Sequence, residues 1–339
     1  MAFRIWIVSF ALAAGCGSAS RADVPPAGRA FYYWRTTFRL SAAERTALAA
    51  ARATRLYVRM FDVQWNATES RAEFVGAIAA AEPAPAGIEV VPVVFLRQDV
   101  FAHLDGDHIR RLANATWAEV SRRAKPIGSA PRELQLDCDW TDTTRDRFFD
   151  YLRGVRAASR VQLSSTIRLH QVKYRERTGV PPVDRGMLMF YNMGTFSAQP
   201  GKRAIFDAEI AAKYLARVDD YPLPLDLALP IWSWTVQLRD DRVVDLLQST
   251  DPDELPAIEF LRPAGDDRFV ATRTAFLHGA LLREGDVLKI ERTTPADTLA
   301  ALELATPHVT PGTISLFDLS ERNLNRYATD QLEQLFSAR

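Results

Sequence analysis

Residues 133–170 read ELQLDCDWTDTTRDRFFDYLRGVRAASRVQLSSTIRLH, and this stretch contains the repeating unit of the fold. An alternating run, Glu133–Trp140, is followed by Thr143–Arg160, where apolar residues recur at helical spacing, and then by a second run, Val161–His170. Alternation of side-chain character indicates a strand with two different faces, whereas apolar residues three or four apart indicate an amphipathic helix. The stretch therefore predicts a strand, a helix and a second strand.

Similar units recur along the rest of the chain. Strands are expected at Phe31–Phe38, Arg55–Val63, Glu89–Arg97, Glu133–Trp140, Val161–His170, Gly186–Asn192, Leu225–Trp234 and Thr313–Leu319. Helices are expected at Ser41–Ala53, Glu69–Ala81, Asp107–Arg123, Thr143–Arg160, Ile205–Val218 and Arg322–Phe336. Parallel strands alternate with helices in α/β folds, and eight strands are the number that closes a barrel. We therefore predict a (β/α)8 TIM-type barrel.

An open, doubly wound sheet is the alternative fold. It would normally carry a glycine-rich phosphate turn after its first strand, and Arg35–Phe38 contains no glycine. The segment between the seventh and eighth strands is much longer than one crossover needs, and within it Phe269–Thr274 and Asp286–Glu291 resemble paired strands. We predict one barrel domain over residues 29–339, with a small α+β insertion at about residues 238–294.

The first residues of the chain resemble an export signal. One arginine precedes the apolar run Ile5–Ala14, and small residues surround Cys16. Leu12–Cys16 resembles the lipobox of bacterial lipoproteins, although Ala13 stands where the usual leucine would be, so ordinary signal cleavage nearby is the alternative. We predict a signal peptide at residues 1–16, lipid attachment at Cys16 and a tether at residues 17–28. The protein would then be an exported periplasmic or cell-surface lipoprotein, held to the membrane by its lipid anchor only.

Composition narrows the possible partners. The chain has 339 residues, and its 42 Lys plus Arg balance its 42 Asp plus Glu, so the net charge is zero. Nucleic acid is not an expected partner, because no basic field is available to bind phosphates. With Cys16 lipidated, Cys138 would be the one remaining thiol and no intrachain disulfide could form. The histidines lack metal-site spacing, and we expect neither a metal nor a cofactor.

Polar side chains gather where two neighbouring strands are expected to end. Asp137 and Asp139 share one face of their strand, and Arg168 and His170 share one face of the next. Active sites of barrel enzymes lie at the C-terminal ends of the strands. Two carboxylates inside a barrel need hydrogen bonds or a cation, because burial penalises their charge. We expect these four residues to meet in a catalytic site; an ion pair that merely fills a polar layer is the alternative.

Two short motifs resemble glycoside hydrolase family 18. Leu136–Thr141 (LDCDWT) is similar to the second half of that family's fourth-strand signature, Asp-x-x-Asp-x-Asp-x-Glu, and Met189–Asn192 (MFYN) is similar to its sixth-strand Met-x-Tyr-Asp. The resemblance implies an eight-stranded barrel, often with an α+β insertion after strand seven. It also implies that Asp139 orients the acetamido group of a sugar, that Asp137 is its partner and that Tyr191 contacts the same group.

Three positions depart from the family 18 pattern. Thr141 stands at the place of the catalytic glutamate, Leu134 at that of the first aspartate, and Asn192 at that of the sixth-strand aspartate. Threonine cannot protonate a glycosidic oxygen at neutral pH. A two-carboxylate mechanism would therefore need another acid beside Asp139. The expected candidates are Asp62, Asp318 and Glu321.

Tryptophans near strand ends suggest surfaces for sugar rings. The candidates for substrate binding are Trp34, Asp62, Asn192, Trp232 and Trp234, and the pair Trp232 and Trp234 is the preferred stacking platform. Trp140 is expected in the core, on the helix-facing side of its strand. Strand-end stretches such as Tyr33–Thr36 also resemble those of exported bacterial barrel lipoproteins, a likeness that implies the fold and no particular activity.

These observations lead to two hypotheses of different kinds. The first is a glycoside-hydrolase-like barrel that acts on or binds an extracytoplasmic glycan through a polar site at its strand ends. The second is a non-catalytic envelope lipoprotein that binds a glycan or a partner protein. The missing glutamate favours binding, whereas charged residues at strand ends favour chemistry, because such charges are costly unless they are used.

Overall fold

A closed parallel barrel forms the body of the molecule. The structure is a computed structural model, and it describes residues 27–199 and 203–337. Within these residues, eight parallel strands follow one another around the barrel as β1 (Gly28–Tyr33), β3 (Arg55–Asn66), β6 (Glu89–Leu96), β7 (Glu133–Cys138), β8 (Gln162–Arg168), β9 (Arg185–Met189), β10 (Leu225–Pro230) and β18 (Thr313–Phe317). Because β1 pairs with both β18 and β3, the ring of strands closes. The predicted (β/α)8 barrel is confirmed, whereas the predicted signal peptide and Cys16 lie outside the described residues.

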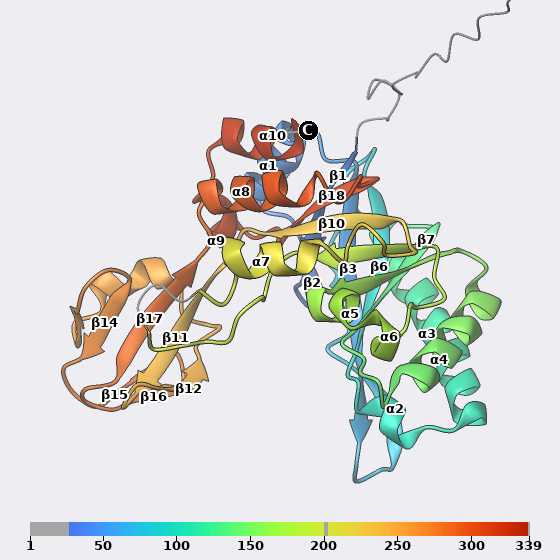
Figure 1. The fold of residues 1–339 in the computed structure, drawn as a ribbon, viewed down its shortest axis with the longest axis horizontal. Coiled ribbons are helices and arrows are strands. Elements are labelled where there is room, and N and C mark those ends of the chain that lie inside the picture. Colours follow the sequence, from blue (N-terminus) through green and yellow to red (C-terminus); the bar gives the residue numbers. More distant parts are fainter. Residues whose placement is uncertain (1–26, 200–202, 338–339) are drawn as a thin grey trace, which may run out of the picture.

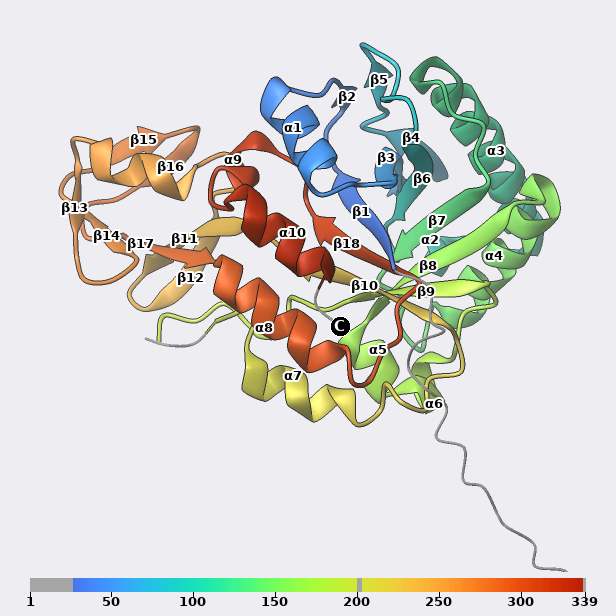
Figure 2. The same ribbon diagram turned by 90° about the horizontal axis from the view of Figure 1, so that it is seen from above.

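Helices cover the outside of the strands, as Figure 2 shows. They are α1 (Ala42–Ala50), α2 (Val100–His103), α3 (Gly106–Ala124), α4 (Arg145–Ser159), α5 (Leu169–Lys173), α6 (Arg175–Thr178), α7 (Ala208–Leu215), α8 (Pro295–Ala305), α9 (Glu321–Leu324) and α10 (Thr329–Ser337), with short 3-10 turns at Lys125–Ile127 and Pro252–Ala257. The first helix begins at a capping box, in which Ser41 and Glu44 each bond the other's backbone N–H. The single helix predicted at Arg322–Phe336 is two helices, α9 and α10.

The helix predicted at Glu69–Ala81 is wrong. That segment forms β4 (Arg71–Val75), an antiparallel partner of β3, and then β5 (Ala79–Ala80), which pairs with β2 (Thr37–Phe38). A turn decides the outcome, since the Asn66 side chain accepts a hydrogen bond from the backbone of Glu69 at 3.0 Å. The Gln64 and Asn66 amides also donate across the hairpin to Glu73. These contacts between strands outweigh the helical spacing of a few apolar residues.

Two predicted strands are shorter than the sequence suggests. β8 ends at Arg168, so His170 lies in α5, and β10 ends at Pro230. The next strand already belongs to the insertion, which begins at Ser233 rather than near residue 238. Trp232 therefore lies at the junction of the two parts, and Trp234 lies on the insertion's first strand.

The insertion is a small antiparallel sheet beside the barrel (orange in Figure 1). Among the described residues its strand order is β12 (Arg242–Leu246), β11 (Ser233–Arg239), β17 (Val287–Arg292), β14 (Arg268–Ala271) and β13 (Leu261–Pro263). A hairpin of β15 (Ala275–Leu277) and β16 (Ala280–Leu282) joins β14 to β17. The sheet has its own apolar cluster, which includes Leu255, Phe269 and Leu288.

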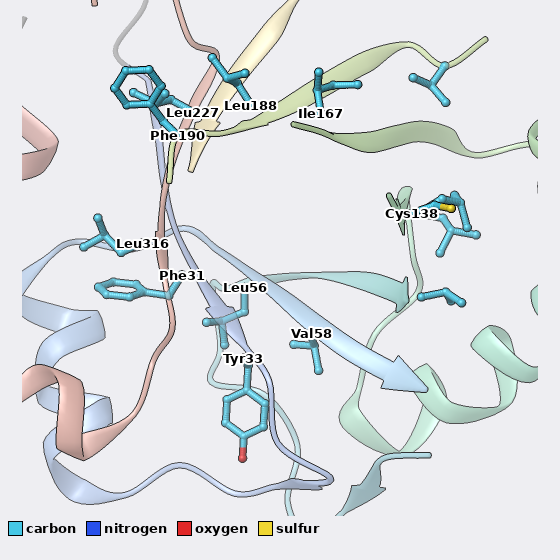
Figure 3. Close-up of a cluster of buried hydrophobic side chains, with 14 of the residues drawn as sticks. Phe31, Tyr33, Leu56, Val58, Cys138, Ile167, Leu188, Phe190, Leu227 and Leu316 are labelled. Carbon is cyan, nitrogen blue, oxygen red and sulfur yellow. The ribbon is translucent and has the colours of Figure 1, made fainter. Parts of the chain in front are cut away.

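The main apolar core lies between the strands and the helices. Outward-facing side chains of alternate strand positions fill it, among them Phe31, Leu56, Ile167 and Leu316 (Figure 3). Each such side chain contributes about 1.5–3 kcal/mol when fully buried. Cys138 belongs to this core, and burial raises the pKa of its thiol, so the group is unreactive.

Ion pairs fill the inside of the barrel at the N-terminal ends of the strands. Arg185 on β9 donates two hydrogen bonds, of 2.7 and 2.5 Å, to Asp226 on β10, which also accepts the backbone N–H of Thr313 on β18 at 2.7 Å. Nearby, Glu133 accepts the Ser164 hydroxyl at 2.5 Å and faces Arg55 at 3.6 Å. Burial raises the pKa of Glu133, an effect that these two partners partly offset. This end of the barrel is closed by paired charges.

We predict that Asp226→Ala destabilises the protein by about 2–4 kcal/mol, because Arg185 and the Thr313 N–H then lose their acceptor. Removing one partner of a fully buried ion pair costs about 3–5 kcal/mol. We expect a smaller loss here because the Arg185 side chain is 24% exposed. Urea unfolding would measure the change. Asp150→Ala is the matched control, since Asp150 and Arg153 form an exposed pair at 2.6 Å that contributes less than about 1 kcal/mol. Equal losses in the two variants would contradict the prediction.

Candidate functional site

The mouth of the barrel lies where the strands end, and strand register decides which side chains enter it. Asp62 on β3 is in register with Phe95 on β6, and Phe95 is in register with Asp137 on β7. Around the ring, Arg168 on β8 is in register with Met189 on β9. Since neighbouring residues in register point to the same side of a sheet, this row faces the inside of the barrel.

Asp137 is sealed in a salt bridge. It accepts a hydrogen bond from Arg168 Nη2 at 3.2 Å and another from the Thr166 hydroxyl at 2.6 Å, and only 3% of the residue is exposed. Both partners belong to β8, as the alternation of the sequence predicts. A carboxylate held in this way is satisfied, so Asp137 fixes Arg168 at the floor of the site.

Asp139 is open to solvent. It follows the last residue of β7, its side chain is 58% exposed, and its Oδ1 lies 3.5 Å from His170 Nε2. A pocket of about 260 Å³ surrounds this pair and is lined by Asp139, Arg168, Leu169, His170, Tyr191, Asn192, Met193 and Tyr214. The pocket thus brings together four of the five predicted catalytic side chains: Asp139, Arg168, His170 and Tyr191. Met193 and Tyr214 were not predicted, because the sequence does not show which loop and helix bend over the mouth.

Tyr191 forms one wall of this pocket. The residue is 6% exposed, and its hydroxyl donates to Met189 Sδ at 3.1 Å. Burial raises the pKa of Tyr191; Arg168 opposes that effect, and the carboxylates of Asp137 and Asp318 add to it. The phenol therefore stays neutral and remains a hydrogen-bond donor. The next residue, Asn192, has a left-handed backbone with φ 54° and lines the same pocket.

Thr141 and Trp140 take structural positions. The Thr141 hydroxyl lies 2.9 and 3.4 Å from the hydroxyls of Thr143 and Thr144, so the side chain at the place of the family 18 glutamate is engaged in the turn before α4. Trp140 is fully buried against Phe148 and donates its indole N–H to the carbonyl of Thr178 at 2.8 Å. Trp140 is in the core, as predicted.

Asp62 is neutralised by an arginine that sequence reasoning missed. Arg59 donates to both carboxylate oxygens, at 2.6 and 2.5 Å. Residues three apart on a regular strand face opposite ways, but a bulge between Arg59 and Phe61 brings Arg59 and Asp62 to the same face. Arg59 therefore engages both carboxylate oxygens of Asp62, and the bulge that pairs the two residues cannot be read from the sequence.

An aromatic wall forms the other half of the mouth. Phe317 at the end of β18 contacts both Trp34 and Trp232 with ring centroids 5.4 Å apart, and Tyr191 meets Trp232 edge to face at 4.7 Å. Trp232 is only 5% exposed, which corrects its expected role as half of a stacking platform. It lies behind the wall because it marks the junction with the insertion. Trp34 and Trp234 are partly exposed and remain available for contact with a ligand.

Asp318 follows β18, and within the described residues no salt bridge joins its carboxylate to a Lys, Arg or His side chain. Its Oδ1 accepts hydrogen bonds from the Asn323 amide and, at 3.4 Å, from the Ser320 hydroxyl. Burial raises the pKa of Asp318, and the more distant charges of Arg322 and Arg35 only partly offset this effect. Glu321, the third candidate acid, is exposed and simply begins α9.

The described residues contain neither a metal-binding cluster nor a membrane-spanning helix. Within residues 27–199 and 203–337, no group of three or more His, Cys, Asp or Glu side chains is placed to hold a metal ion. In the same part of the chain, no helix is both long and apolar enough to cross a membrane.

We predict that Asp318→Asn becomes stabilising relative to the native protein as the pH rises from about 3 to 7. A carboxyl whose pKa is higher in the folded than in the unfolded chain costs stability once the pH passes its unfolded value, near 3.9. The asparagine variant avoids that cost while keeping an oxygen for Asn323 to bond. Urea unfolding at both pH values would measure the difference. Asp139→Asn is the exposed control, and an equal pH dependence in both variants would contradict the prediction.

Comparison with known proteins supports the fold. No protein-family model and no curated protein matches the sequence. The spore cortex-lytic enzyme SleL of Bacillus cereus is similar in structure, with a TM-score of 0.53 and 14% sequence identity over 92% of this chain and 74% of that one. SleL of Bacillus megaterium QM B1551 gives a TM-score of 0.54 at 10% identity, over 92% and 73% of the two chains. At these identities the likeness establishes a shared fold.

Proposed function

We propose that the barrel mouth binds a glycan of the cell envelope and hydrolyses it. The observation that carries the proposal is the division of the mouth into two walls. Trp34 and Trp234, both partly exposed, belong to the aromatic side through their ring contacts, and Asp139, Arg168 and His170 line the pocket on the polar side. Sugar rings offer apolar faces for stacking and hydroxyl groups for hydrogen bonding, so a site with one wall of each kind suits them.

Two carboxyl groups in contrasting environments would carry the reaction. Asp139 is exposed beside His170, whereas Asp318 is partly buried with a raised pKa. Such a contrast is typical of an acid and base pair, in which the group with the raised pKa donates the proton. We therefore assign Asp318 as proton donor and Asp139 as base. The two follow strands on opposite sides of the barrel, β7 and β18, and we expect inversion at the anomeric carbon, which needs room for a water molecule.

Neighbouring side chains would position the sugar. Arg168 is fixed by Asp137, and Tyr191 is a neutral phenol at the edge of the same pocket. Both are donors that could bind a carbonyl or hydroxyl oxygen of the substrate. The shared fold with cortex-lytic enzymes supports starting the search with polymers of the cell envelope.

We predict that the purified protein releases soluble sugar from at least one envelope polysaccharide, and that Asp318→Asn and Asp139→Asn each lower kcat by roughly a hundredfold or more. Trp234→Ala should instead raise KM, because it removes a stacking surface and no reacting group. Product release and binding would be measured on peptidoglycan and a polysaccharide library. Asp150→Asn, on the exposed face of α4, is the control.

A second function, glycan binding without catalysis, is favoured by one observation. The residue at the family 18 acid position is a threonine, which contributes no carboxyl group and whose hydroxyl is engaged in the turn before α4. Binding that depends on Trp234 without any turnover would establish this alternative. Neither binding nor turnover on any glycan would remove both.

We further propose that the protein is exported and anchored in the envelope through a lipid on Cys16. The support is the sequence alone, with its short apolar run and small residues before the cysteine. Labelling of cells with radioactive palmitate should mark the native chain and the Cys138→Ser variant but not Cys16→Ser. Equal labelling of the two variants, or label on none of the three proteins, would contradict the anchor.

A further inference from the structure

A two-step hydrogen-bond chain lies behind Asp318. Asn323 on α9 is only 1% exposed, and its Nδ2 donates both to the carbonyl oxygen of Asp318, at 3.2 Å, and to its carboxylate Oδ1. The Oδ1 of Asn323 in turn accepts a hydrogen bond from Arg326 Nη2 at 2.8 Å. The carboxyl is therefore connected through one buried amide to a guanidinium group.

Arg326 is itself held from three directions. Besides Asn323, its Nη2 reaches the carbonyl of Ile231 at 3.4 Å, and its Nη1 lies 3.8 Å from Asp253 of the insertion. Its side chain is 11% exposed, and burial lowers the pKa of its guanidinium. The arginine thus joins the end of β10, the insertion and α9 at one point.

The chemistry of arginine fixes which way the amide faces. A guanidinium has donors and no acceptor, so the Asn323 side chain must turn its oxygen toward Arg326. Its NH2 group is then directed at Asp318. Both side-chain donors to the Asp318 carboxyl bond its Oδ1. No residue in the described part of the chain donates a hydrogen bond to Oδ2, so this second oxygen has no protein partner.

We propose that Asn323 and Arg326 are positioning residues for the proton donor. They hold the Asp318 carboxyl in one orientation through its Oδ1 and leave Oδ2 without a hydrogen bond from the described residues. This inference rests on the proposed role of Asp318 and adds two residues to it. The other groups that act on Asp318 are Arg322 on α9, Arg35 after β1 and the Ser320 hydroxyl, and Tyr191 after β9 is in turn affected by its charge.

The first test measures the pKa of Asp318 directly, by carbon NMR titration of its carboxyl in the intact protein without substrate. Asn323→Ala should raise that pKa above its native value, because it removes a donor that stabilises the ionised form. Asn325→Ala is the matched control, since Asn325 is exposed on the same segment and should leave the pKa unchanged. An unchanged pKa in a folded Asn323→Ala protein would overturn the inference.

Arg326→Met provides a second route if the first variant does not fold. Without the guanidinium, the Asn323 amide can rotate and turn its oxygen toward the carboxylate, so the pKa of Asp318 should again rise. Arg326→Lys keeps a donor and should restore much of the native value. If the pKa of Asp318 is the same in the native protein, in Arg326→Met and in Arg326→Lys, Arg326 has no role in holding the carboxyl.

The second test uses turnover on whichever glycan is found. Asn323→Ala should lower kcat roughly ten- to a hundredfold with KM little changed, and should move the alkaline limb of the pH profile upward. A shifted pKa with unchanged kcat would overturn the positioning role. If no glycan is hydrolysed, the proposed function fails, whereas the NMR titration still decides whether the chain of hydrogen bonds controls Asp318.

Discussion

A carboxylate buried inside the barrel needs a partner of opposite charge, and this requirement determines which acidic side chains are left to react with a substrate. Arg185 neutralises Asp226 at the closed end, Arg168 neutralises Asp137 in the middle, and Arg59 neutralises Asp62 near the mouth. Burial of an unpaired carboxylate would cost several kcal/mol, so these pairs are part of the fold and not reserves of reactivity. Asp139 needs no such partner because its carboxylate is exposed to solvent. Burial raises the pKa of Asp318, which favours the uncharged form of this carboxyl.

Besides carrying Trp234, the insertion holds one loop of the site in place. Lys289 on β17 donates to the carbonyl of Ser197 at 3.0 Å, and Glu291 accepts the N–H of Ala204 at 2.7 Å. Both partners belong to the loop between β9 and α7, which also contains Tyr191 and Asn192. Phe196 of the same loop packs on Trp234 with ring centroids 5.2 Å apart. The small sheet therefore holds one rim of the mouth in place, and its loss would disturb the site as well as its own core.

The sequence predicts what depends on neighbouring residues along the chain. The alternation of Glu133–Trp140 correctly separates Asp137, inside the barrel, from Cys138 and Trp140, in the outer core. The β3–β4 hairpin was missed because contacts between strands, such as Gln64 with Glu73, decide it. The pairing of Arg59 with Asp62 was missed for a related reason, since it depends on a bulge. Asn323 gave no signal at all, because its importance comes from the residue that it bonds, Asp318, whose carboxyl the sequence does not show to be folded back onto the start of α9.

The polarity of the strands has a consequence for how such a molecule would work in an envelope. The chain enters β1 at Gly28, whose N–H bonds the carbonyl of Gly312 at the closed end, and the site lies at the opposite, C-terminal end of the strands. Residues 17–27, fully extended, would span at most roughly 40 Å. If the proposed lipid is attached at Cys16, this tether would join the barrel at the end opposite the site, so that the anchor and the substrate would not compete for the same face of the molecule.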